Sequence, residues 1–229
     1  MKIKITLFFL ILTNLTNSQI KVEYSTSIIG SYLNEETKKK NVEFAKNLEG
    51  IEDKISTYKF LLYINGGKSR FENIKTMSSD KNKYMEDQAS IVIGEKEIYY
   101  RDNDKKIIIN NCDVIGQRFN VFDDFNKIKW NITSESKIIN NFECFKATWA
   151  YQKIDVIAWF CPKLPYAFGP MEYGNLPGLI LELNRGKFVY LATKIYKDFN
   201  EIIKMPVGKQ KTKKEIDKMC LEALENMSK

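Results

Sequence analysis

Alternating apolar and polar residues predict β-strands from the start of the chain. In residues 20–28 every second residue suits one buried strand face. Residues 58–64 alternate in the same way. The Asn-Gly-Gly sequence at residues 65–67 supplies turn residues before a further alternation at residues 69–71. The second and third runs therefore predict a β-hairpin.

Further apolar runs follow at short intervals. Residues 76–88 are polar and predict a loop, while residues 34–54 predict either a weak surface helix or a mobile loop. Short strands joined by tight turns, without helices between them, favour a mainly β, antiparallel fold over a βαβ fold. The strands expected in this part lie at residues 91–93, 97–100, 106–110, 128–132, 142–151, 154–160, 179–183 and 187–196.

A helical pattern ends the chain. Thr212 and Glu215 fit a capping box, and apolar residues then recur at helical spacing. We expect an amphipathic helix over residues 212–228, with its apolar stripe covering part of the sheet. Lysines near its start indicate either a solvated linker or contact with a membrane surface or another anionic partner; they are Lys209, Lys211, Lys213 and Lys214.

The first eighteen residues predict a cleaved signal peptide. Lys2 and Lys4 precede an apolar run at residues 5–12 and a small-residue cleavage site before Gln19. The apolar run is too short to span a bilayer, and the alternative is a buried N-terminal strand. We expect one β-rich domain over residues 19–229, periplasmic or secreted, without a transmembrane segment or lipid anchor.

Composition narrows the possible chemistry. The 229 residues contain no His, which excludes Ser-His-Asp and Cys-His nucleophile systems and imidazole-bound catalytic zinc. The formal net charge is +7, but only four of the 36 basic residues are Arg. Specific readers of nucleic acid favour Arg, so we expect no nucleic-acid partner. We also expect no cofactor and no metal site.

The four cysteines of an exported protein favour two disulfides. If a turn of even length joins the strands at residues 142–151 and 154–160, Cys144 faces Cys161 at a separation that permits a bond. An odd turn length would break this register. Cys112 and Cys220 remain as the second pair by elimination. No Cys-x-x-Cys spacing indicates a redox-active site.

A proline-rich segment connects two of the expected strands. Four of the five prolines lie in residues 159–183, where an ordered but irregular connection is expected, because Pro fixes φ and Gly admits unusual conformations. Pro177 and Gly178 fit a type II turn. This segment contains Asn175-Leu176-Pro177-Gly178-Leu179-Ile180.

The segment resembles the GLPGLI family, exported proteins of unassigned activity found widely in the Bacteroidetes. Five of the six motif positions match, and Asn175 replaces the first glycine. Asn also tolerates the left-handed conformation, which preserves the turn. The supporting matches are Trp130, Phe142-x-Cys144-x-Lys146-Ala147, Ala158-Trp159-Phe160, Pro165 and Gly169-Pro170.

The resemblance implies a strongly curved, half-barrel-like sheet, similar in outline to exported proteins that hold lipid or other hydrophobic ligands. The segment then either shapes a sheet edge and fills the core, or lines a concave surface for a lipid, peptide or partner strand. The residues expected on such a ligand or partner surface are Trp130, Trp149, Trp159, Pro170, Tyr173, Leu176, Pro177 and Gly178.

Three functions compete on the sequence. The first is a non-catalytic exported protein that binds a hydrophobic ligand or peptide on the curved sheet. The second is a cell-envelope accessory protein that recognises a membrane protein through the stretch rich in Gly and Pro at residues 159–183. The third, the least favoured, is a carboxylate-based hydrolase using Asp123, Asp124 and Glu172. Asp123 and Asp124 are better explained as solvated turn residues. No catalytic residue is therefore assigned, and we expect that the protein is not an enzyme.

Overall fold

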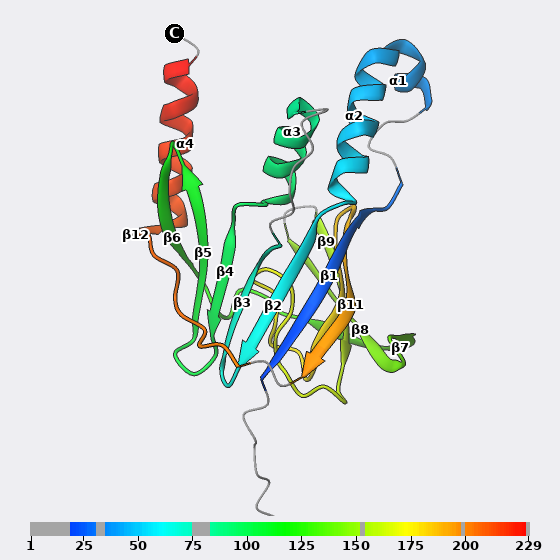
Figure 1. The fold of residues 1–229 in the computed structure, drawn as a ribbon, viewed down its shortest axis with the longest axis vertical. Coiled ribbons are helices and arrows are strands. Elements are labelled where there is room, and N and C mark those ends of the chain that lie inside the picture. Colours follow the sequence, from blue (N-terminus) through cyan, green and yellow to red (C-terminus); the bar gives the residue numbers. More distant parts are fainter. Residues whose placement is uncertain (1–18, 31–34, 75–82, 152–153, 198–199, 228–229) are drawn as a thin grey trace, which may run out of the picture.

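The computed structural model describes residues 19–30, 35–74, 83–151, 154–197 and 200–227 (Figure 1). The predicted signal peptide lies outside this part of the chain. Within it, twelve strands form one sheet in the order β12-β6-β5-β4-β3-β2-β1-β11-β10-β9-β8-β7. The strands are β1 Ile20–Ile28, β2 Lys59–Asn65, β3 Lys68–Asn73, β4 Ile98–Asp102, β5 Ile107–Val114, β6 Gln117–Asp123, β7 Asn131–Ile139, β8 Phe142–Tyr151, β9 Ile154–Cys161, β10 Leu179–Arg185, β11 Phe188–Lys197 and β12 Lys209–Thr212.

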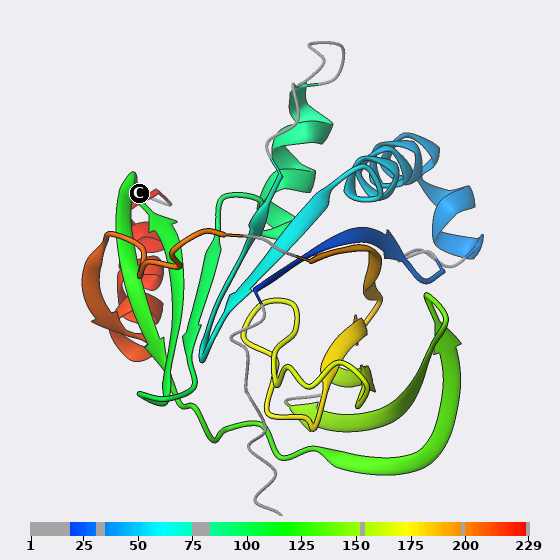
Figure 2. The same cartoon turned by 60° about the horizontal axis from the view of Figure 1, so that its bottom comes forward.

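The predicted fold class is confirmed. Neighbouring strands pair antiparallel, except that β12 runs parallel to β6. The sheet is strongly curved but does not close, so that it encloses a concave side (Figure 2). The helices stand at one end of the sheet or on its flank; they are α1 Glu35–Lys40, α2 Val42–Ile55, α3 Lys83–Ile93 and α4 Lys213–Met227.

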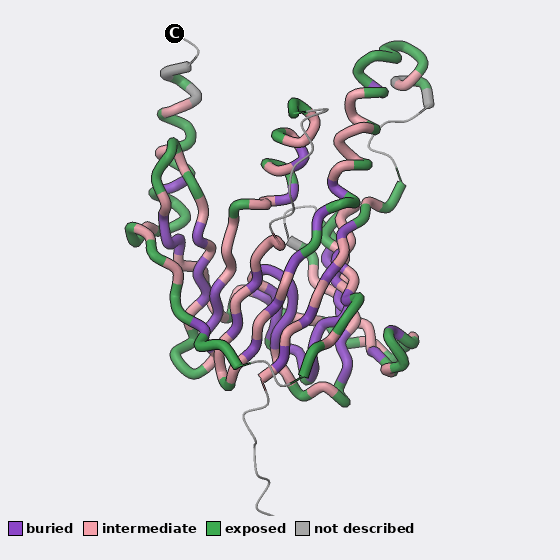
Figure 3. The backbone as a smooth tube through the Cα atoms, in the orientation of Figure 1, coloured by how far each residue is buried: buried purple, intermediate pink, exposed green. Residues whose placement is uncertain are grey.

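Strand alternation builds the core as the sequence predicts. Val22 of β1 pairs with Leu62 of β2, and Leu62 pairs with Phe71 of β3; all three side chains are buried. Because residues directly opposite each other point to the same face of a sheet, such rows bury one face continuously. Figure 3 shows the buried positions concentrated along the strands and sparse on the helices.

One row leads out of this core. Phe71 pairs with Tyr99 of β4, and Tyr99 pairs with Asn110 of β5. Asn110 in turn pairs with Val121 of β6. These positions therefore share the concave face of the sheet, and the row changes from fully apolar to partly polar as it crosses β4 and β5.

The irregular connection between β9 and β10, residues 162–178, is rich in Gly and Pro and is called the Gly-Pro segment. It fills the concave side of the sheet (yellow in Figure 2). Its backbone pairs with the start of β10, where the Leu179 N–H donates to the Leu164 carbonyl at 2.9 Å and the Ile180 N–H to the Phe168 carbonyl at 3.0 Å. The hydroxyl of Tyr24 donates to the Ile180 carbonyl at 2.6 Å, which connects the first strand to the start of β10, where this segment ends. The segment is thus part of the core.

Helix α3 corrects one sequence prediction. The sequence predicts a strand at residues 91–93 and a loop at residues 76–88, but α3 occupies Lys83–Ile93. Residues 76–82 of the expected loop lie outside the described part of the chain. Ala89 and Ile93, four residues apart, are buried, whereas Ile91 and Val92 between them are exposed. Three consecutive apolar residues do not distinguish a helix from a strand, and the helical spacing becomes visible only with Ala89 included.

The other helices agree with the sequence. The stretch that predicted a helix or a loop forms α1 and α2, and the Asn41 side chain caps α2 by accepting from the Phe44 N–H at 3.0 Å. At α4, the Thr212 N–H donates to Glu215 Oε2 at 2.8 Å and the Glu215 N–H to Thr212 Oγ1 at 3.3 Å, which is the predicted capping box.

Helix α4 packs against the far edge of the sheet. Ile216 contacts a small cluster around Phe119 and Val121 of β6. Strands β6 and β12, which hold the helix there, were not predicted from the sequence. In the described residues no helix has the length and apolar character needed to cross a membrane.

Candidate functional site

The residues expected on a ligand surface lie mostly in the core. Leu176 is 1% exposed and Tyr173 2% exposed, and Pro170 and Gly178 are also buried. Only Pro177 is exposed. This corrects the expectation of an open aromatic surface, because the Gly-Pro segment itself occupies the concavity that a ligand would need.

Two of the three predicted tryptophans surround this segment. The rings of Trp130 and Trp149 lie 6.2 and 6.4 Å from the ring of Tyr173. The indole Nε1 of Trp130 donates to the Gly174 carbonyl at 2.8 Å. These contacts fix the segment in place, so Trp130 and Trp149 act in packing.

Trp159 does not join the other tryptophans. Lys137 Nζ lies 4.3 Å from the centre of its indole ring, and the same ammonium bonds Glu182 at 2.6 Å. Trp159 pairs with Lys146 in β8, and Lys146 forms an ion pair with Glu135. Trp159 therefore belongs to a charged patch, separate from the Tyr173 cluster.

All four cysteines are free thiols in the structure, so neither predicted disulfide is present in it. The predicted register is nevertheless confirmed. Phe145 pairs with Phe160, which makes Cys144 and Cys161 the next residues in opposition. Burial, followed by the Cys161 thiol, raises the pKa of Cys144 to about 12. The Cys220 thiol lies close enough to Cys112 to contribute to the raised pKa of Cys112, whose main cause is burial.

The carboxylates considered for hydrolysis are engaged by a lysine or by backbone. Lys127 Nζ forms an ion pair with Asp123 and lies 3.6 Å from Glu172. Asp124 is exposed and accepts from the Asn126 N–H at 2.9 Å, as expected of a turn residue. A lysine shared between two carboxylates compensates their charge, which is an arrangement suited to structure or binding.

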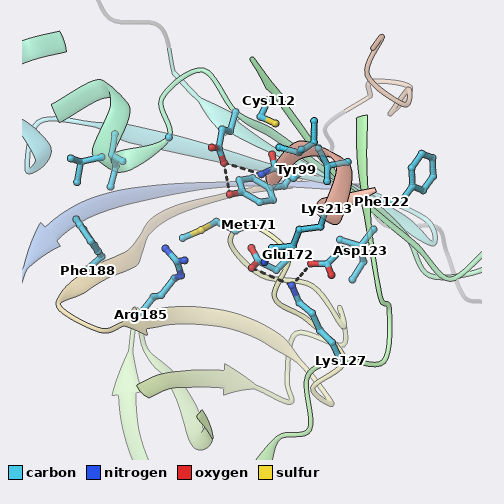
Figure 4. A pocket seen from close by; sticks show the side chains of 18 of the residues that line it. Tyr99, Cys112, Phe122, Asp123, Lys127, Met171, Glu172, Arg185, Phe188 and Lys213 are labelled. Atoms are coloured by element: carbon cyan, nitrogen blue, oxygen red, sulfur yellow. Dashed lines mark hydrogen bonds and ion pairs between the residues drawn. The ribbon is translucent and has the colours of Figure 1, made fainter. Parts of the chain in front are cut away.

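A pocket of about 320 Å³ lies on the concave side, next to the core (Figure 4). It opens between β4, β5 and β6 on one side and β10, β11 and the Gly-Pro segment on the other. Helices α3 and α4 supply the rest of its wall. Its apolar lining is Ile91, Val92, Ile93, Ile108, Val121, Phe122, Met171, Phe188 and Ile216; its charged and polar lining includes Glu97, Tyr99, Asn110, Asp123, Lys127, Glu172, Arg185, Tyr190, Lys213 and Asp217.

Glu97 is held in one corner of the pocket. The Tyr99 hydroxyl donates to Glu97 Oε2 at 2.5 Å, and Asn110 Nδ2 donates to the same oxygen at 3.2 Å. The register between β4 and β5 sets this corner, because it places Tyr99 directly opposite Asn110. Burial above all, with nearby carboxylates, raises the pKa of Tyr99 well above its ordinary value, so Tyr99 stays a neutral donor.

Arg185 enters the pocket from the opposite wall. It is the last residue of β10 and pairs with Phe188 of β11, so both side chains share the concave face. Figure 4 shows its side chain directed toward Met171 and Glu172. Burial lowers the pKa of Arg185. The combined effect of Tyr173, Glu172 and other neighbours raises this pKa by more than burial lowers it, so the net shift is upward. Arg185 therefore carries its charge at any physiological pH.

Tyr190 completes this wall. It lies two residues after Phe188 on the same strand face, and its ring packs edge-on against Phe60 and Phe71 at 5.7 and 6.1 Å. Burial raises the pKa of Tyr190 far above its ordinary value, although Arg185 acts in the opposite direction. The side chain thus joins the aromatic core to the polar pocket.

Sequence reasoning missed Arg185, Tyr190 and Glu97 as site residues. Arg185 falls between the strands expected at residues 179–183 and 187–196, and Tyr190 falls within the second of them. The available signal was weak: two residues separate Tyr190 from Phe188, which indicates a shared face, and Arg185 is one of only four arginines. Their convergence depends on pairing between distant strands. Among the described residues, no group of three or more Cys, Asp or Glu is placed to hold a metal ion.

Comparisons with known proteins agree with the fold and leave the activity open. Residues 148–182 match a family model described as a protein of unknown function (Porph_ging), a stretch well under half of the chain. It contains the motif at residues 175–180 on which the GLPGLI resemblance depends. No curated protein matches the chain.

The chain is also similar to the solved structure of PNGF-II, in two crystal forms, both with a TM-score of 0.58 and 15% sequence identity. The match covers 90% of this chain and 33% of PNGF-II, so the chain spans about a third of that protein. At this identity the likeness concerns the fold alone.

Proposed function

We propose that the protein is an exported, non-catalytic binding protein of the GLPGLI type that holds a small amphiphilic molecule in the pocket between β4–β6 and β10–β11. The observation that carries the proposal is the division of the pocket lining into an apolar part and a charged part. A volume of about 320 Å³ is within the range of small-molecule sites. The sequence of the first eighteen residues supports export.

In this proposal the hydrophobic ligand lies in the pocket next to the Gly-Pro segment, not on the aromatic surface expected from the sequence. The Gly-Pro segment closes the aromatic concavity, whereas the neighbouring pocket remains hollow beside Met171, Phe188 and Ile93. Recognition of a membrane protein through the Gly-Pro segment has less support, because Tyr173 and Leu176 are buried. Hydrolysis also has less support, because Lys127 compensates both Asp123 and Glu172.

A bound molecule can be sought directly. Protein exported by its own signal sequence is purified without detergent and analysed by native mass spectrometry, where we expect a complex heavier than the polypeptide. In parallel, the ligand-free protein is titrated with the neutral apolar fluorophore N-phenyl-1-naphthylamine. Val92→Glu places a charge at the apolar wall of the pocket, where Val92 is already 51% exposed and the fold therefore tolerates the change.

The matched control is Val42→Glu on α2, a residue that is 70% exposed and does not line the pocket. We expect Val42→Glu to keep the fluorescence and Val92→Glu to lose most of it. Equal fluorescence in the two variants, or no fluorescence and no added mass in the parent protein, contradicts the proposed function.

A further inference from the structure

We infer that Arg185 and Tyr190 form a subsite for a carboxylate head group, so that the ligand of the pocket is a carboxylate with an apolar tail. This inference depends on the proposed binding function and specifies its ligand. It follows from the way the polar groups in the pocket are partnered.

The negative groups deep in the pocket already have partners. Glu97 accepts from Tyr99 and Asn110. Asp123 and Glu172 share the ammonium of Lys127. A cationic ligand would have to displace these contacts, and would gain only the difference between the new and the old interaction.

The positive group on the facing wall is not matched in this way. Within the described part of the chain, Arg185 forms no ion pair within 4 Å, although Glu172 lies near enough to raise its pKa; the Tyr173 hydroxyl is another polar neighbour. A guanidinium presents five donors in a planar fork, which fits the two oxygens of a carboxylate. Arg185 thus has donors available for an anionic ligand, and the elevated pKa keeps them charged.

The Tyr190 hydroxyl supplies a second donor. Tyr190 is 4% exposed and lines the pocket, yet its hydroxyl has no hydrogen-bond partner in the described residues. This hydroxyl is not one of the fully buried side-chain atoms that lack a partner, so it reaches the open space of the pocket, where water or a ligand can accept its hydrogen bond. Arg185 pairs with Phe188 and Leu183 pairs with Tyr190, so Arg185 and Tyr190 lie on the same face of adjacent strands, two residues apart in register.

The lining beside these donors is apolar. Phe188 follows Arg185 across the β10–β11 turn, and Met171 and Ile93 extend the apolar surface toward α3. Lys213 and Asp217 of α4 are exposed, where water screens their charges. A ligand with its carboxylate at Arg185 and a short aliphatic or aromatic tail along Phe188 satisfies both parts of the pocket.

Three probes of equal chain length test the head group: sodium octanoate, octylamine and 1-octanol, titrated by calorimetry below their aggregation limits. We expect octanoate to bind at least tenfold more tightly than the other two. Arg185→Gln should remove this preference. Tyr190→Phe deletes only the hydroxyl oxygen and should weaken octanoate binding about five- to tenfold, in line with the loss of one hydrogen bond to a charged group.

The control is Arg118→Gln, which removes an arginine whose guanidinium donates to the Lys96 carbonyl outside the pocket. It should bind octanoate as the parent protein does. Equal affinity for the three probes overturns the carboxylate subsite but leaves the binding function intact. No binding of any probe, together with no fluorescence from N-phenyl-1-naphthylamine, contradicts both. If Arg185→Gln fails to fold, an unchanged affinity in Tyr190→Phe still overturns the inference.

Discussion

Arg101 of β4 donates from Nη2 to the side-chain oxygen of Asn175, the first residue of the Asn-Leu-Pro-Gly-Leu-Ile sequence. Arg101 is buried and also donates from Nη1 to the Glu172 carbonyl at 3.1 Å. The Asn175 amide in turn donates to the Phe125 carbonyl at 3.2 Å. One asparagine thus joins the Gly-Pro segment, β4 and the connection after β6, and its φ of 64° lies in the left-handed region.

Substitution of Asn175 should separate the backbone requirement from the side-chain requirement. Asn175→Gly keeps the left-handed backbone but leaves a buried guanidinium with one acceptor fewer, at a cost of about 1–3 kcal/mol in unfolding free energy. Asn175→Ala adds the strain of a Cβ at positive φ, about 1–2 kcal/mol more. Urea denaturation of both variants measures the two terms. An alanine variant as stable as the glycine variant contradicts the backbone part of this account.

The motif glycine after Pro177 has a different role, which is close approach. A Cβ on Gly178 would meet the backbone of Cys161 and lie 2.8 Å from the Pro162 nitrogen. Gly178→Ala should therefore force strand β9 and the Gly-Pro segment apart, with a loss of about 3 kcal/mol or more in unfolding free energy.

Gly116→Ala provides the comparison for this variant. Gly116 has φ +74°, and an added Cβ there meets nothing within 4 Å. Its cost should be only that of the positive φ, about 1–2 kcal/mol. Chemical denaturation of the two variants gives the difference, and equal losses would show that close approach at Gly178 is unimportant.

Local pattern predicted the fold well where a strand has one buried face. The alternation at residues 20–28 and the hairpin at residues 58–71 correspond to β1, β2 and β3, because a period of two directly reflects burial on one side. Prediction was poor where burial comes from a distant partner. Strand β12 pairs in parallel with β6, a contact that no local periodicity encodes, and α3 buries only two of its residues.

The candidate site was less predictable than the fold. Sequence reasoning favoured the aromatic residues of the Gly-Pro segment, since apolar residues near a motif resemble a binding surface. Burial of Tyr173 and Leu176 shows that their hydrophobicity serves packing. Arg185 and Glu97 become a site only because the sheet curves until β10 faces β4, and this curvature depends on the whole strand order.

The two thiols of Cys144 and Cys161 should form a disulfide when the protein refolds in the presence of an oxidant, while both thiols are still accessible. Their β8–β9 register sets them opposite each other, and both are buried. With oxidised glutathione, each thiol gives up one hydrogen and the oxidant is reduced to two glutathione thiols. The bond should add about 3 kcal/mol to the unfolding free energy, as expected for a loop of this length.

Intact-mass analysis before and after oxidation, with iodoacetamide to count free thiols, checks this expectation. The exposed Cys220 should alkylate first, whereas Cys144, with a pKa of about 12, should remain unreactive while the protein is folded. The Cys112→Ser and Cys220→Ser double variant should still lose two hydrogens on oxidation, and adding Cys144→Ser to this double variant should abolish the loss. Four alkylatable thiols after complete oxidation would rule out the bond.

The capping box of α4 should make the attachment of this helix sensitive to acid. Lys211, followed by the Thr212 backbone N–H, lowers the pKa of Glu215 from 4.5 to about 2. Because the folded state holds this carboxyl ionised, its stabilising effect is present above pH 4.5 and is lost as the pH falls from about 4.5 toward 2. Glu215→Gln should lower stability at neutral pH and remove this part of the acid dependence.

The relevant quantity is therefore the difference in unfolding free energy between the parent protein and Glu215→Gln, measured at several pH values by urea denaturation and circular dichroism. Other carboxylates titrate in the same range, but their contributions cancel in the difference. Glu222→Gln, at an exposed ion pair with Lys218 on the same helix, is the control and should change little with pH. A difference between parent and Glu215→Gln that stays constant from pH 6 to pH 2 would mean that the capping carboxylate does not hold α4 at its N-terminus.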